Sequence, residues 1–214
     1  MTLEKLISSF GQAGFARADV RLRARYLREG GLLPMGGRGR GAPHMDSTAA
    51  ARLVLAILAN TSQTTSPPAV QRLSAMEPRP AELPAYSRRD FPDWTPPPLF
   101  TADLLGSLAQ LLDWWRLPDP TLSGAPSWSE DFHGLTVTWA NGTPVATIEL
   151  VLNPVHIWGA GPDRLLTVQQ KFAEPGEQIG DKVGVWFSAT AHKEVFLVIA
   201  QALGQLKHAE EDRE

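Results

Sequence analysis

Arginines recur at short, regular intervals between residues 17 and 28, and they are the side chains of this sequence best suited to binding chemistry. Four of them follow one another at steps of four, four and three positions: Arg17, Arg21, Arg25 and Arg28. This spacing places the four on one face of a helix. A guanidinium group keeps its charge and presents a planar fork of N–H donors, which suits phosphate oxygens and base edges. The pattern predicts a helix with a cationic face that binds a polyanion.

A second basic segment, residues 35–44, reads Met-Gly-Gly-Arg-Gly-Arg-Gly-Ala-Pro-His. Four glycines exclude a helix interior, and the short length favours a tight hairpin or wing. Backbone amides, together with Arg38 and Arg40, would approach a phosphate or the minor groove there. His44 at its end suits either a phosphate contact or a turn. Because such a segment also suits non-specific RNA binding, it does not by itself identify the nucleic acid.

The charge of the chain is divided unevenly along its length. Residues 1–60 hold nine basic and four acidic side chains, a net charge of +5, whereas the remainder holds 11 basic and 19 acidic side chains, a net charge of −8. This layout is typical of a protein in which one segment meets a polyanion. The alternative is an ordinary solvated basic helix.

Enzyme chemistry has little support in the sequence. The chain has no cysteine, which excludes thiolate chemistry and fits a cytoplasmic protein. No phosphate-binding loop, dinucleotide fingerprint or nucleophile elbow is present. The five histidines have no recognised metal spacing, although some of them could converge in the fold with Glu149 or Glu194: His44, His133, His156, His192 and His208. We therefore expect no enzyme activity, no cofactor and no metal.

The elements expected in the first 60 residues are three helices. Apolar spacing predicts helices over residues 3–10 and 16–29, and a third that begins at Asp46, Ser47 or Thr48 and ends near Asn60. The next segment, 61–98, is rich in proline and is interpreted as a linker with one short helix near 69–76.

The remaining residues predict a small α+β domain with an antiparallel sheet and flanking helices. A helix is expected over 101–115, capped by Thr101. Alternation over 135–139, a turn at Asn141-Gly142 and a return over 145–152 predict a hairpin. Further strands are expected over 164–172 and 182–187, and a final helix over 190–207. The six tryptophans of this part suit core packing, a ligand pocket or an oligomer interface.

The first 60 residues resemble the MerR-type winged helix-turn-helix. The resemblance is carried by Arg25-Tyr26, the connector Gly31-Leu32-Leu33-Pro34, the basic segment with Arg38 and Arg40, and the helix that follows Asp46. It departs from the family pattern at Leu27, where an aromatic residue is expected, in the missing wing tyrosine, and in the proline-rich stretch that replaces the long dimerising helix. Together with the arginine spacing and the basic segment, the resemblance predicts DNA contacts by a set of nine residues: Arg17, Arg21, Arg23, Arg25, Tyr26, Arg28, Arg38, Arg40 and His44.

These observations together predict a sequence-specific regulator of transcription, of bacterial or phage type, that binds double-stranded DNA. Three parts are expected: a winged helix-turn-helix at 1–60, a linker at 61–98, and a domain at 99–214 that forms the dimer or binds a protein or small-molecule effector. No run of apolar residues is long enough to suggest a membrane partner. The alternative function is a DNA-binding assembly or adaptor protein, for example in phage packaging, that acts by oligomerisation. An enzyme in the C-terminal part is a second alternative without positive support.

Overall fold

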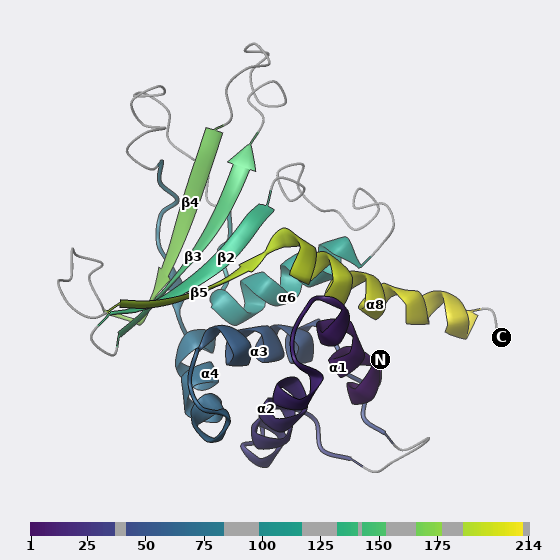
Figure 1. Cartoon of the computed structure of the whole chain (residues 1–214). Coiled ribbons are helices and arrows are strands. Elements are labelled where there is room, and N and C mark those ends of the chain that lie inside the picture. The colour runs from purple at the N-terminus through teal and green to yellow at the C-terminus, as the bar shows by residue number, and fades with distance from the viewer. Residues whose placement is uncertain are drawn as a thin grey trace.

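Strands from the second half of the chain, joined by one two-residue strand from the first half, form one antiparallel sheet, and helices from both ends of the sequence pack together against it (Figure 1). The structure is a computed structural model that describes residues 1–36, 42–83, 99–116, 132–140, 143–152, 166–176 and 186–211. Within these ranges it holds six α-helices, one short 3-10 helix and five strands. The predicted α+β class is confirmed.

The three N-terminal helices are α1 (Leu3–Gln12), α2 (Arg17–Glu29) and α3 (Ser47–Leu58), close to the predicted ranges. The turn between α1 and α2 contains Gly14, whose φ of 95° favours glycine. The Asp46 side chain caps α3 by accepting a hydrogen bond from the Ala49 amide. Each helix buries its apolar stripe, because these residues are the ones that gain most from leaving water.

The segment predicted as a linker is partly structured. It forms a 3-10 helix (η2, Gln63–Thr65), helix α4 (Ser66–Ser74) and the two-residue strand β1 (Glu77–Pro78). Helix α4 starts three residues before the predicted one, since the prolines at 67 and 68 are well tolerated in a first turn. Its Val70 and Leu73 are fully buried. Residues 84–98 of the proposed linker lie outside the described ranges.

Helices from the two halves of the sequence share one hydrophobic core. Helix α3 packs on α6 (Leu104–Trp115), and α1 packs on α8 (Lys193–Glu211). One cluster of buried side chains runs from Met1 to Leu203. The boundaries predicted at residues 60 and 98 therefore do not coincide with a gap in the packing, although the division into functional parts stays a prediction.

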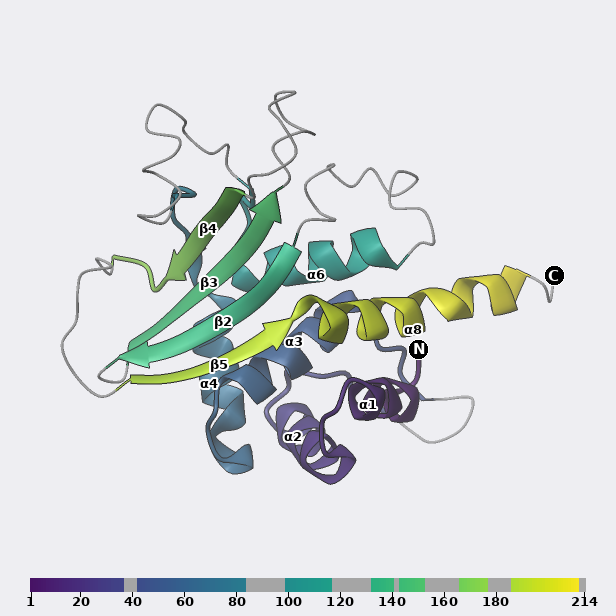
Figure 2. The ribbon, with the colours of Figure 1, turned by 45° about the horizontal axis from the view of Figure 1, so that its top comes forward.

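The sheet has the strand order β1-β4-β3-β2-β5, with every neighbouring pair antiparallel. Figure 2 shows β4, β3, β2 and β5 side by side in this order. The predicted hairpin is confirmed as β2 (Phe132–Ala140) and β3 (Thr143–Leu152), whose register pairs Ala140 with Thr143. The turn residues, 141 and 142, lie outside the described ranges. Strand β4 (Leu166–Ala173) also agrees with its prediction. Leu135, Ile148 and Phe172 point from these strands into the core.

Two boundaries in the C-terminal half were predicted wrongly. Strand β5 spans Trp186–His192, so Thr190 belongs to a strand and the final helix begins only at Lys193. The reason is the pairing of β5 with β2, in which Thr190 lies opposite Thr136. Helix α6 is capped by Asp103, whose side chain accepts a hydrogen bond from the Gly106 amide, and not by Thr101.

Candidate nucleic-acid interface

A groove of about 770 Å³ lies between α1, α2 and the segment that leads into α3. Helix α2 lines it with Arg21, Arg25 and Arg28, while α1 supplies Leu3, Glu4 and Ile7 together with Thr2 just before it. Gly36, Ala42, Pro43 and Met45 complete the lining. The groove thus combines three guanidinium groups with an apolar floor. It also reaches both ends of the glycine-arginine segment, since residues 36 and 42 flank residues 37–41.

Three of the arginines of α2 line this groove because of their positions around the helix. At about 100° per residue, Arg17, Arg28, Arg21 and Arg25 fall within an arc of about 80°. The buried stripe of Val20, Ala24 and Leu27 occupies a separate part of the circumference. The predicted cationic face of α2 is therefore present, and it flanks the groove. Arg17 lies at the start of this face, and its side chain runs close over Gly11 of α1.

Two of the groove arginines already hold a carboxylate. Arg21 Nη2 donates a hydrogen bond to Glu4 Oε2 at 2.8 Å, and Arg25 Nε donates to Glu29 Oε1 at 2.8 Å. The hydrogen bond and the charge of the carboxylate raise the pKa of each arginine. All four side chains are more than half exposed. Ion pairs so open to water contribute little to the stability of a fold, and phosphates can replace the carboxylates at low cost.

Arg28 differs from its neighbours in having no ion pair with any residue in the described part of the chain. Its side chain is partly exposed and lines the same groove. An unpaired guanidinium beside a cavity is the group that gains most from an added phosphate oxygen. Among the described residues, Arg28 is therefore the groove arginine whose donors are not used by a carboxylate.

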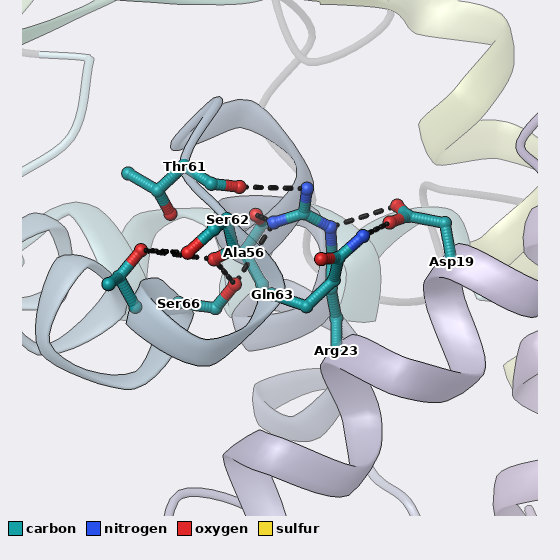
Figure 3. Close-up of polar contacts among 8 residues, drawn as sticks. Asp19, Arg23, Ala56, Thr61, Ser62, Gln63 and Ser66 are labelled. Atoms are coloured by element: carbon teal, nitrogen blue, oxygen red, sulfur yellow. Dashed lines mark hydrogen bonds and ion pairs between the residues drawn. The ribbon is translucent and has the colours of Figure 1, made fainter.

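Arg23 lies elsewhere, in a buried network that joins α2 to the end of α3 and the start of α4 (Figure 3). Its Nε donates to Asp19 Oδ2 at 2.9 Å, and its terminal nitrogens donate to the Ala56 carbonyl, Ser66 Oγ and the Thr61 carbonyl. The residue is 9% exposed. Its donors are thus used inside the protein, and the structure does not bring Arg23 to the groove as the sequence predicted.

Asp19 completes the network on the solvent side. Its Oδ1 accepts a hydrogen bond from Gln63 Nε2 at 2.7 Å, while Arg23 holds Oδ2. Burial by itself raises the pKa of Asp19, but the hydrogen bonds from Arg23 and Gln63 and the charge of Arg23 outweigh it, so the pKa is lowered. The carboxylate therefore stabilises the folded state at neutral pH.

The other predicted DNA-binding residues are dispersed. Tyr26 is half-buried on a different part of the α2 circumference from the arginine arc. His44 is exposed, and its Nε2 lies 2.6 Å from the Met1 amine instead of lining the groove. Arg38 and Arg40 lie outside the described residues.

The sequence did not indicate Glu4, Glu29 or the apolar floor as parts of this site. The spacing of Arg25 and Glu29, four positions apart on one helix, was a signal for their ion pair. No local signal could have found the pair of Arg21 and Glu4, because the two residues belong to different helices.

A second hollow, of about 320 Å³, lies on the face of the sheet that carries polar side chains. His133, His192 and Glu149 line it, so two of the five histidines lie near Glu149, one of the two arrangements that the sequence left open. The two imidazole rings are 5.8 Å apart between centroids, and Glu149 accepts a hydrogen bond from Gln169. Nevertheless, no three acidic or histidine side chains in the described ranges are arranged to hold a metal ion.

Comparison with the models of known protein families, with curated proteins and with solved structures gave no match. None of the helices in the described ranges is both long and apolar enough to cross a membrane. The groove on α2 is therefore interpreted from its own residues.

Proposed function

We propose that this protein binds double-stranded DNA through an N-terminal winged helix-turn-helix of the MerR type and regulates transcription at specific sites. One observation carries the proposal: the groove that contains Arg21, Arg25 and Arg28 lies beside both ends of the segment with Arg38 and Arg40. A recognition helix next to a basic wing is the arrangement by which such domains hold a duplex.

The proposed binding mode follows from the size and charge of α2. An α-helix with its side chains is about 10 to 12 Å wide, which matches the major groove of B-form DNA. In this binding mode, the arginine face of α2 contacts phosphates along one edge of the major groove of the DNA. Arg21 and Arg25 also reach base edges there. Arg38 and Arg40 contact a neighbouring phosphate or the minor groove and position the protein without reading sequence.

A dimer is part of the proposal, because two copies would read two half-sites on one face of the duplex. The described C-terminal residues supply a sheet and two helices for such an interface or for an effector.

A genome-fragment selection with the full-length protein tests the proposal. We expect one short motif to be enriched, with an affinity that falls steeply as salt rises. The variants R21A and R25A should lose preference for this motif, whereas R38A and R40A should bind all duplexes more weakly to the same degree. R72A is the control, because Arg72 is partly exposed and ion-paired but belongs to α4, outside the groove. Equal binding by wild type and all four groove and wing variants contradicts the proposal.

The second candidate function is a DNA-binding assembly or adaptor protein. It is favoured by the shared core of the N-terminal helices with α6 and α8, since a regulator with a separable DNA-binding head would not need this packing. Light scattering of the purified protein separates the two functions. A dimer supports the regulator, and a ring-like higher oligomer supports the assembly protein.

A further inference from the structure

Two carboxylates pair with arginines of the cationic groove as phosphates would: Glu4, which itself lines the groove, and Glu29, which lies outside its lining. Glu4 pairs with Arg21 and Glu29 pairs with Arg25, each at 2.8 Å. Carboxylate and phosphate oxygens accept the same charge-assisted hydrogen bonds from guanidinium groups. A polyanion that enters the groove must therefore displace these carboxylates from the arginines or remain close to their negative charges.

The position of Glu29 has no explanation in the stability of its helix. It is the last residue of α2, where the helix dipole is negative and an acidic side chain is unfavourable. The order of its pair, with arginine four positions before glutamate, is the weaker of the two orders. The pair is also open to water, with side chains 70% and 51% exposed. The main effect of the Glu29 carboxylate is therefore to offset the positive charge of Arg25.

Glu4 has a helix-stabilising role in addition to its ion pair. It lies in the first turn of α1, where the helix dipole favours a negative charge. Its carboxylate nevertheless lines the groove together with all three arginines. The two glutamates therefore differ in their effect on stability, but they share the effect on the charge of the groove.

From these positions we infer that Glu4 and Glu29 are internal counter-ions that compete with DNA phosphates for Arg21 and Arg25, and so set the affinity of the groove. The inference depends on the proposed DNA-binding function. In this role the two glutamates weaken contacts with the phosphate backbone. Every duplex offers such contacts, whatever its sequence. The protein thereby binds every duplex less tightly than its arginines alone would allow.

The substitution Glu29→Gln in the full-length protein tests this role, because glutamine keeps the shape of the side chain and removes the charge. Removing one charge about 7 Å from a phosphate in a water-like medium should strengthen binding roughly threefold. The double variant E4Q/E29Q should bind roughly tenfold more tightly by the same reasoning. E174Q is the matched control, since Glu174 forms a similar ion pair with Arg72 outside the groove.

The measurement is fluorescence anisotropy with the selected duplex and an unrelated duplex at two salt concentrations. We expect E29Q to bind both duplexes more tightly, with a steeper dependence on salt and an unchanged urea midpoint, and we expect E174Q to match wild type. If wild type binds but E29Q binds equally well or more weakly, the role of the glutamates is wrong and the DNA-binding function stands. If wild type binds neither duplex, both are wrong.

Discussion

Arg23 and Arg25 are two positions apart on the same helix, yet one is buried in a hydrogen-bonded network and the other is open to solvent. The Arg23 side chain is 11% exposed and donates to partners in α2, α3 and the start of α4. The Arg25 side chain is 70% exposed and pairs only with Glu29, one helical turn away, among the contacts described. Arginine content alone therefore overstates a binding surface, because burial and satisfied donors remove some of these residues from it.

The comparison predicts that the largest loss of stability comes from Arg23. Replacing Arg23 with alanine leaves two carbonyls, the Ser66 hydroxyl and one Asp19 oxygen without this donor in a mostly dry site. We expect the free energy of unfolding to fall by about 3 kcal/mol. Urea denaturation followed by circular dichroism measures it. For R25A we expect a loss of less than about 0.5 kcal/mol. An equally small loss for R23A would contradict the distinction between the two arginines.

Replacing the arginines that line the groove should weaken DNA binding with little loss of stability. The triple variant R21A/R25A/R28A removes the guanidinium groups that line the groove. We expect its affinity for the selected duplex to fall about 30-fold or more at moderate salt. Each phosphate contact that is lost leaves fewer counterions to be released on binding, and this release favours the complex. Anisotropy titration measures this affinity, and a urea midpoint near that of wild type shows that the variant is folded.

The Ser66 hydroxyl is one of the acceptors that hold the Arg23 side chain in its buried network. Ser66 is fully buried, accepts a hydrogen bond from Arg23 Nη1 at 3.0 Å and donates one to the Ser62 carbonyl. Ser66→Ala should lower the free energy of unfolding by about 1 kcal/mol, since it removes both bonds. Thr64→Ala is a control at an exposed hydroxyl in the same region. Equal urea midpoints for S66A and wild type would show that Arg23 does not need this acceptor.

The smallest effect is expected in acid. The lowered pKa of Asp19 means that its carboxylate stabilises the fold above the pKa of the unfolded chain, and that this contribution is lost as the pH falls below about 4. The variant D19N should therefore be less stable than wild type at pH 7, with the difference shrinking toward pH 3. Urea midpoints across this range measure it, and a difference that grows in acid would contradict the sign.

Local patterns were sufficient to predict several elements and the arginine arc. Helix α2 and the hairpin of β2 and β3 each depend on residues that are close in sequence. For the cap of α3 the sequence left Asp46, Ser47 and Thr48 open, and the structure has Asp46. The burial of Arg23 was not predictable, because its acceptors at Ala56, Thr61 and Ser66 lie 33 to 43 positions away. The same limit applies to β5, whose extent is decided by its pairing with β2 and not by its own sequence.

The proposed binding of DNA phosphates by the arginine-lined groove is tested most directly by the salt dependence of binding. The logarithm of the association constant, plotted against the logarithm of salt concentration, gives a slope of about −0.9 per phosphate contact. For the full-length protein we expect the slope of R21A/R25A/R28A to be shallower than that of wild type by about two to three units. The slope of R72A should equal that of wild type. Equal slopes for wild type and the triple variant would contradict the claim.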